Sequence, residues 1–114
     1  MRLRTLATAA ACGLAVLFAA APSASAAEGD FTYVYSDPSG TPRLGHFVDP
    51  PSRVCITLPE TAEPWTPPAH SPRNGTDATA TVFTGPGCDG EWFTLRPNGG
   101  HASERLKLRS VVFS

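Results

Sequence analysis

The chain has 114 residues with 10 glycines, 12 prolines and a formal net charge of −1. A chain of this length supports one small domain, and a charge this close to neutral gives no reason to expect nucleic-acid binding. The charge is no higher after residue 26, where 7 Lys/Arg against 10 Asp/Glu leave a net of −3.

The N-terminal segment has the pattern of a secretory signal peptide. Arg2 and Arg4 precede an apolar run, and Ala24 and Ala26 fit an A-x-A cleavage site. We expect cleavage after Ala26, with cleavage after Ala27 as the alternative. The apolar run is too short and too rich in alanine to span a bilayer, which needs about 20 strongly apolar residues. We therefore expect a secreted protein that has no membrane attachment after cleavage.

Removal of residues 1–26 leaves a single domain, residues 27–114, with two of the three cysteines. In an oxidising compartment Cys55 and Cys88 should form a disulfide. The chain-entropy model gives such a cross-link about 3 to 4 kcal/mol of stabilisation, which a domain with a small core needs. A zinc site is not expected, because the sequence has no C-x-x-C or H-x-x-x-H spacing.

The composition of the remaining chain predicts an all-β domain. No stretch sustains helical periodicity, and short runs of β-branched and aromatic residues recur between clusters of Pro, Gly, Asn and Asp. The expected strands are residues 31–35, 43–47, 53–58, 78–83, 91–95 and 106–113.

A proline-rich segment, residues 59–75, separates the first three expected strands from the last three. Its five prolines predict an ordered or semi-extended connection rather than a helix. We expect Trp65 to fold back over the core, because an exposed tryptophan is costly without a partner. If Trp65 projects instead, the connection becomes a recognition surface. Asn74 also begins a formal N-glycosylation sequon.

Basic residues alternate along the start of the last expected strand. Arg105, Lys107 and Arg109 should line one face of it, either as a solvated face or as a contact for an acidic partner or polyanion.

The apolar residues of the same strand change parity near its middle. Leu106 and Leu108 share one parity, whereas Val111 and Phe113 share the other. All four can be buried only if the strand has a bulge near residues 109 and 110, or if both of its faces are covered near the end.

The spacing of key residues in the second half resembles the Greek-key motif of the βγ-crystallin family. Phe83, Cys88 and Gly90 reproduce the pattern aromatic-x-x-x-x-aromatic-x-Gly, with cysteine at the second aromatic position. The segment from Ser110 to Phe113 resembles the closing serine and aliphatic strand of that motif.

A second copy of the spacing lies fifty residues upstream. Tyr33 and Gly40 have the same separation, and Pro38 replaces the second aromatic residue. The resemblance implies two Greek-key motifs in one β-sandwich, with motif 1 at about 30–58 and motif 2 at about 76–114. It also implies that the disulfide joins one motif to the other and that each motif glycine has a conformation closed to other residues.

Members of this family often bind calcium through a pair of Asn or Asp residues before the closing serine. Arg105 and Leu106 stand at those positions here, and Arg109 stands where a Ser or Thr ligand would be. Cationic and apolar side chains cannot supply oxygen ligands. The first copy offers Asp49 and Ser52 but no acidic pair. We therefore expect no metal and no cofactor.

His46, His70 and His101 are the candidate catalytic residues, but none has a nucleophile or carboxylate at an informative spacing. We do not expect an enzyme.

The layout is similar to that of small secreted actinobacterial proteins, and metalloproteinase inhibitors and killer-toxin-like proteins share the fold of the family that the chain resembles. The resemblance implies a monomeric binding protein whose partner is an extracellular protease or another protein. The alternatives are a structural or stress-related extracellular protein without a specific ligand, and a killer-toxin-like protein. Recognition should fall on the connection with Trp65 and on the turns at 36–40 and 97–100.

Overall fold

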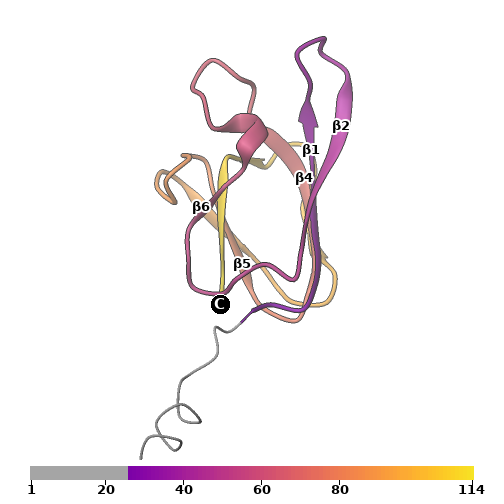
Figure 1. The fold of residues 1–114 in the computed structure, drawn as a ribbon, viewed down its shortest axis with the longest axis vertical. Helices are drawn as coiled ribbons and strands as arrows, with labels where there is room; N and C mark the ends of the chain where they lie inside the picture. Colours follow the sequence, from indigo (N-terminus) through magenta and orange to yellow (C-terminus); the bar gives the residue numbers. More distant parts are fainter. Residues whose placement is uncertain (1–25) are drawn as a thin grey trace, which may run out of the picture.

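The computed structural model describes residues 26–114, so the predicted signal peptide lies outside it except for its last residue. The described chain is all-β and sandwich-like, with two antiparallel sheets packed against each other (Figure 1). Its elements are β1 Gly29–Ser36, β2 Pro42–Val48, β3 Ile56–Thr57, the 3-10 helix η1 Pro59–Thr61, β4 Ala69–Thr76, β5 Ala80–Phe83, β6 Trp92–Leu95, β7 Gly100–His101, β8 Lys107–Leu108 and β9 Ser110–Phe113. The all-β prediction is therefore confirmed.

The two halves of the chain contribute to both sheets. The first sheet has the order β2-β1-β4-β7, with β8 also paired to β4, and the second has the order β3-β9-β5-β6. The third strand of the first half, β3, thus lies in the sheet of the second half, while β7 and β8 lie in the sheet of the first half.

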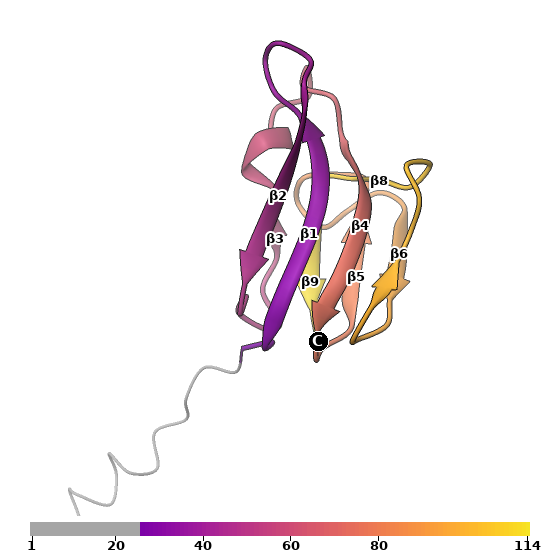
Figure 2. The same ribbon diagram turned by 90° about the vertical axis from the view of Figure 1, so that its right-hand side faces the viewer.

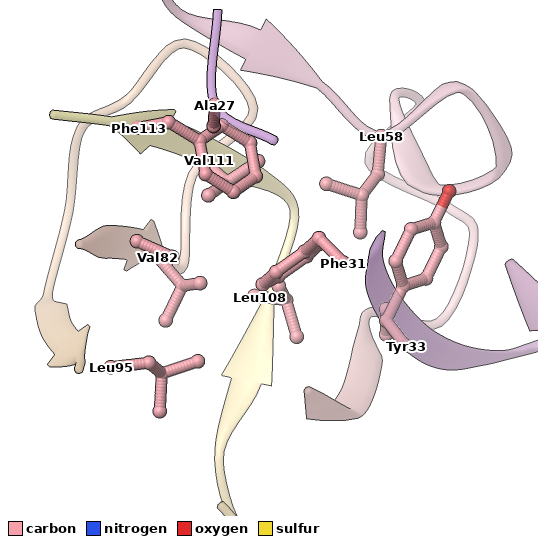
Figure 3. Packing of buried hydrophobic residues seen from close by; sticks show 11 residues of the cluster. Ala27, Phe31, Tyr33, Leu58, Val82, Leu95, Leu108, Val111 and Phe113 are labelled. Carbon is pink, nitrogen blue, oxygen red and sulfur yellow. The ribbon is translucent and has the colours of Figure 1, made fainter. Parts of the chain in front are cut away.

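The core fills the space between the two sheets (Figure 3). Phe31 and Tyr33 of β1 alternate with more exposed neighbours, as expected for a strand with one buried face. Phe31 meets Phe113 of β9 edge to face, with ring centroids 5.3 Å apart. This contact joins the first strand of the domain to the last.

The strand β4 occupies much of the segment that was predicted to be a connection. It was missed because proline cannot donate to a strand ladder and is rare in central strands. The structure accommodates Pro72 at an irregularity, where the register with β1 shifts between Thr32 and Val34. The preceding Ser71 has φ of +52°. The predicted connection is therefore correct only for residues 59–68, where it also includes the short helix η1.

The expected C-terminal strand is two strands in two different sheets. Lys107 and Leu108 pair with β4, whereas the segment after Arg109 pairs with β3 and β5. Leu108 and Val111 are both buried, although their parities differ. The chain resolves the change of parity by crossing from one sheet to the other at Arg109.

Cys55 and Cys88 form the predicted disulfide, with their Cα atoms 5.9 Å apart. The bond links the start of β3 to the β5–β6 hairpin, so it fastens the short strand from the first half to the second half of the chain.

Candidate functional site

Trp65 projects from the end of the molecule where the η1 segment lies. Thr66 closes a turn by donating from its amide to the Glu63 carbonyl at 3.1 Å, and its hydroxyl donates to the same oxygen at 2.6 Å. Pro64 holds the second position of this turn, where its fixed φ is favourable. Trp65 occupies the third position and is 78% exposed. The expectation that Trp65 caps the core is therefore wrong.

Arg109 holds the Trp65 turn from the side that faces the sheets. Its Nη1 donates to the carbonyl oxygens of Thr61 at 2.8 Å and Glu63 at 3.0 Å, and its Nη2 donates to the Thr66 carbonyl at 2.7 Å. The planar guanidinium presents several donors in a fixed geometry, so it fixes three points of the loop at once. Arg109 was predicted as a candidate contact for a partner; its guanidinium instead bonds within the protein.

A hollow of about 650 Å³ lies between the Trp65 turn and the tip of the β1–β2 hairpin. Trp65 and Pro67 line one side, Pro38 and Gly40 line the other, and Glu60 also contributes. Two of the loops that were predicted separately as recognition surfaces therefore border the same concave surface. Figure 1 shows both at the same end of the molecule.

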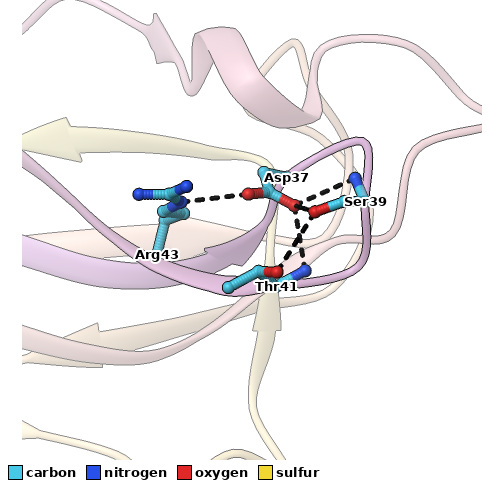
Figure 4. A network of polar contacts seen from close by, with 4 residues as sticks. All are labelled: Asp37, Ser39, Thr41 and Arg43. Atoms are coloured by element: carbon cyan, nitrogen blue, oxygen red, sulfur yellow. Dashed lines mark hydrogen bonds and ion pairs between the residues drawn. The ribbon is translucent and has the colours of Figure 1, made fainter.

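The hairpin tip is ordered by one carboxylate (Figure 4). Asp37 accepts from the hydroxyl of Ser39 at 2.7 Å, the amide of Thr41 at 2.9 Å and Nε of Arg43 at 3.0 Å. These bonds, that of Ser39 first, hold the pKa of Asp37 well below its usual range. Gly40 completes the turn with φ of +84°, which a side chain would strain.

Glu60 is connected to the core beneath the hollow. The hydroxyl of Tyr33 donates to Oε1 of Glu60 at 2.7 Å, although the tyrosine is only 1% exposed. Burial, followed by this hydrogen bond and by the negative charge of Glu60, raises the pKa of Tyr33 well above its usual value of 10. Tyr33 also packs against Gly45 so closely that a Cβ there would overlap its ring.

The motif residues of the second half gather at the β5–β6 hairpin. Ser110 accepts from the amide of Cys88 at 2.9 Å and donates to the carbonyl of Gly85. Phe83 pairs with Ser110, and Gly90 has φ of +82°. The Ser110 hydroxyl thus connects the β5–β6 hairpin to β9. In the first half, by contrast, β1 and β2 stay paired as far as Ser36 and Pro42, next to the hairpin tip.

The other predicted residues lie away from the Trp65 turn. Arg105 and Lys107 are exposed and border a separate hollow of about 280 Å³ beside Phe93. Asn74 is fully buried, and its Nδ2 donates to three backbone carbonyls, including that of Ala78 at 2.7 Å. The sequon is therefore inaccessible in the folded domain.

Among residues 26–114, no group of three or more His, Cys, Asp and Glu residues is placed to hold a metal ion. The same part of the chain contains no helix that is long and apolar enough to cross a membrane.

Sequence reasoning missed the part that Arg109 and Glu60 play in this site. No local pattern identifies either residue, because their partners are 43 to 48 residues away for Arg109 and 27 residues away for Glu60.

Comparison of the chain with protein-family models, curated proteins and solved structures gives no significant match.

Proposed function

We propose that this protein is a secreted, monomeric, non-catalytic binding protein that engages an extracellular protein with Trp65 and the hollow beside it. The observation that carries the proposal is the 78% exposure of Trp65 on a turn held by Arg109. Tryptophan is among the side chains most often found as the energetic anchor of an interface. A turn fixed before binding also loses little conformational freedom when a partner binds.

An oxidising location is supported by the disulfide between Cys55 and Cys88. Cleavage of the signal peptide after Ala26 fits the structure better than cleavage after Ala27. Ala27 is 1% exposed, and its amide donates to the Pro50 carbonyl at 2.8 Å. Loss of this residue would remove both the packing and the hydrogen bond.

The order of the strands supports the βγ-crystallin-like interpretation of the fold. The first half supplies β1, β2 and β4 to one sheet and β3 to the other, and the second half supplies β5, β6 and β9 to one sheet and the short strands β7 and β8 to the other, as two Greek keys with exchanged strands would. The second hairpin, tied down by Ser110, fits this interpretation. The first hairpin departs from it, because β1 and β2 remain paired almost to the tip.

An extracellular protease is the leading partner. The turn that ends at Thr66 leaves the Trp65 indole protruding from the surface. The hydrogen bond from Thr66 to Glu63 that closes this turn is incompatible with the extended backbone of a protease substrate. Inhibition would therefore depend on Trp65 and the hollow rather than on cleavage-site mimicry. A structural or stress-related role without a specific ligand, and a killer-toxin-like role, are the alternatives.

A panel of secreted metalloproteases and serine proteases tests this proposal. The protein should inhibit at least one of them, and Trp65→Ala should weaken that inhibition by roughly 30-fold or more, the equivalent of about 2 kcal/mol for an interface anchor. Trp92→Ala is the matched control, because Trp92 is also exposed, at 65%, but lines a different hollow.

The melting temperature of Trp65→Ala should stay close to that of the wild type, since the side chain covers little of the core. Equal losses of inhibition in the two tryptophan variants would contradict the proposed site. If none of the proteases is inhibited, the protease hypothesis is wrong and the structural role becomes the better proposal.

A further inference from the structure

The outer face of the first sheet collects basic side chains from four strands. His46 of β2 pairs with Thr32 of β1, Thr32 pairs with Arg73 of β4, and Arg73 pairs with His101 of β7. Directly paired residues in a sheet point to the same face. These four residues therefore form one row, and with strands about 4.8 Å apart the row is about 14 Å long.

A second row lies beside the first on the same face. Leu44 of β2 pairs with Val34 of β1, Val34 pairs with His70 of β4, and His70 pairs with Lys107 of β8. Thr32 and Val34 are two residues apart on β1, so their side chains share a face. Arg105, Lys107 and Arg109, which were predicted to line one face of the C-terminal strand, therefore do not form one surface. Lys107 lies beside basic residues of other strands instead.

All three histidines of the chain lie in these two rows. We call the set His46, His70, Arg73, His101 and Lys107 the histidine face. Four of its members are exposed, and His70 is partly exposed. Figure 2 looks onto this sheet from outside, and no other element of residues 26–114 lies in front of β1, β2 and β4.

The charge of the histidine face depends on pH. The titratable groups that share the outer face are Asp30 of β1, Arg73 of β4, Lys107 of β8 and the three histidines, and Glu104 lies in the loop just before β8. At the edge of the face, Arg96 lines a hollow with His101, and Glu91 and Arg105 line a hollow with Lys107. Asp30 pairs with Val48 and Gly75 at one end of the sheet. With neutral histidines the face has two cations against Asp30, and with protonated histidines it has five.

Two of the imidazoles are oriented by hydrogen bonds. Nδ1 of His101 lies 3.0 Å from the carbonyl oxygen of Gly99. A carbonyl can only accept, so Nδ1 carries the proton and Nε2 is the atom that takes up the second one. Nδ1 of His70 lies 2.8 Å from the hydroxyl of Ser71, which can accept as well as donate. Both rings can therefore be protonated without losing these contacts.

We propose that the histidine face binds a linear anionic polymer whose charges are sulfate or phosphate groups, and that binding strengthens below neutral pH. Charge complementarity is the argument for this occupant. The cations lie in two adjacent rows on an exposed β-face, and imidazole takes up its proton between about pH 5 and 8. The surface is separate from the Trp65 site, so this proposal does not depend on the proposed function.

The paired residues of this face disfavour a single-stranded nucleic acid as the occupant. Proteins that bind single strands stack bases on aromatic side chains. The two rows contain Thr32, Val34 and Leu44 besides the histidine face, and none of these is Phe, Tyr or Trp. The exposed aromatic residues nearest to the rows are Trp92 and Phe93, which belong to β6 in the other sheet and line hollows that Lys107 and His101 border. A sulfated polysaccharide and an inorganic polyphosphate are the two sources of the proposed chemistry that remain.

The test measures binding of the disulfide-bonded protein to fluorescently labelled heparin and to labelled polyphosphate at pH 5.5 and 7.5, over a range of salt concentrations. Each exposed charge pair contributes only a small amount, so three protonated histidines together should tighten binding by about tenfold at pH 5.5. Added salt should weaken the binding. The polymer that binds more tightly identifies the source.

Three variants locate the binding to the face. Replacement of His46, His70 and His101 together by glutamine should remove the tenfold difference between the two pH values. Arg73→Gln should weaken binding at both. The matched control is Arg53→Gln, which removes an exposed cation that belongs to no strand of the first sheet and should change nothing.

A variant that should bind more tightly keeps the proposal testable even if the triple variant fails to fold. His46→Lys places a permanent cation at an exposed position and should tighten binding at pH 7.5 by about threefold, as one added charge pair would. Equal binding at the two pH values would overturn the proposal. So would pH dependence that persists in a folded triple variant, or equal effects of Arg53→Gln and Arg73→Gln. Tighter binding of a labelled oligothymidylate than of either polymer would overturn the choice of occupant.

Discussion

Replacement of Arg109 by glutamine tests whether the Trp65 turn is rigid because a distant side chain holds it. The variant removes the guanidinium that donates to the carbonyls of Thr61, Glu63 and Thr66 at 2.7 to 3.0 Å. Glutamine is shorter and has a single amide, so it cannot reach all three oxygens. The backbone hydrogen bonds of residue 109 to Phe83 and Leu58 should remain.

The size of the effect follows from those contacts. A hydrogen bond that involves a charged group contributes about 1.5 to 3 kcal/mol when it is well shielded from water. Arg109 is only partly buried, and water can solvate the released carbonyls, so we expect a net loss of about 2 kcal/mol for the set. For a domain of this size that loss corresponds to a decrease in melting temperature of about 8 to 16 °C.

Thermal melts and amide hydrogen exchange measure the two parts of this prediction. The melting temperature should fall, and the Thr66 amide, which closes the turn onto Glu63, should exchange faster than in the wild type. Trp92→Phe leaves Trp65 as the only tryptophan, so the fluorescence anisotropy of the indole reports its mobility directly. Arg109→Lys is the matched control for charge. Its melting temperature should lie between those of Arg109→Gln and the wild type, because one ammonium group cannot donate to all three carbonyls as the planar guanidinium does.

An unchanged exchange rate at Thr66 in Arg109→Gln would refute the idea that the guanidinium orders the turn. An equal melting temperature for Arg109→Lys and the wild type would show that charge, rather than the geometry of the donors, is what matters.

Three further predictions concern the domain as a whole. Replacing Cys55 and Cys88 together by alanine should lower the melting temperature by roughly 15 °C or more, because closing a loop over a separation of 33 residues contributes about 3 to 4 kcal/mol, and a variant that melts like the wild type would contradict this. The raised pKa of Tyr33 means that the unfolded chain loses its proton first, so stability should fall as pH rises above 10. Alkaline melts should show a smaller decrease for Tyr33→Phe, and identical alkaline profiles would rule out this tyrosine as the cause. Millimolar calcium should leave the melting temperature unchanged relative to chelator, because Arg105, Leu106 and Arg109 stand where the calcium-binding motif needs oxygen ligands; a rise of several degrees would show an unidentified calcium site.

The fold class and the disulfide could be predicted because both depend on local composition and on the number of cysteines. The central strand β4 could not, since Pro72 argues against a strand unless the irregularity opposite Thr32 and Val34 is known. The crossing at Arg109 was visible only as a change of parity between Leu108 and Val111. Parity alone does not distinguish a bulge from a change of sheet.

The candidate site was predictable as a set of loops but not as one surface. Trp65 and the segment around Gly40 each have a local signal, namely an aromatic residue among prolines and a turn sequence. Their shared hollow depends on the pairing of β1 with β4, which brings the two loops to the same end of the sheet. The exposure of Trp65 depends on the contact from Arg109, 44 positions further along the chain.

Because β3 lies in the second sheet and β7 and β8 lie in the first, neither half of this chain contains a complete sheet. A fragment that ends before β5 would contain β3 without the neighbour β9 that it pairs with, and a fragment that begins at β5 would contain β7 and β8 without β4. The native disulfide also needs a cysteine from each half, Cys55 and Cys88. Ribosomal synthesis of the first half therefore produces an incomplete sheet, and the domain should acquire protease resistance in a single step, only after its C-terminal strand is available.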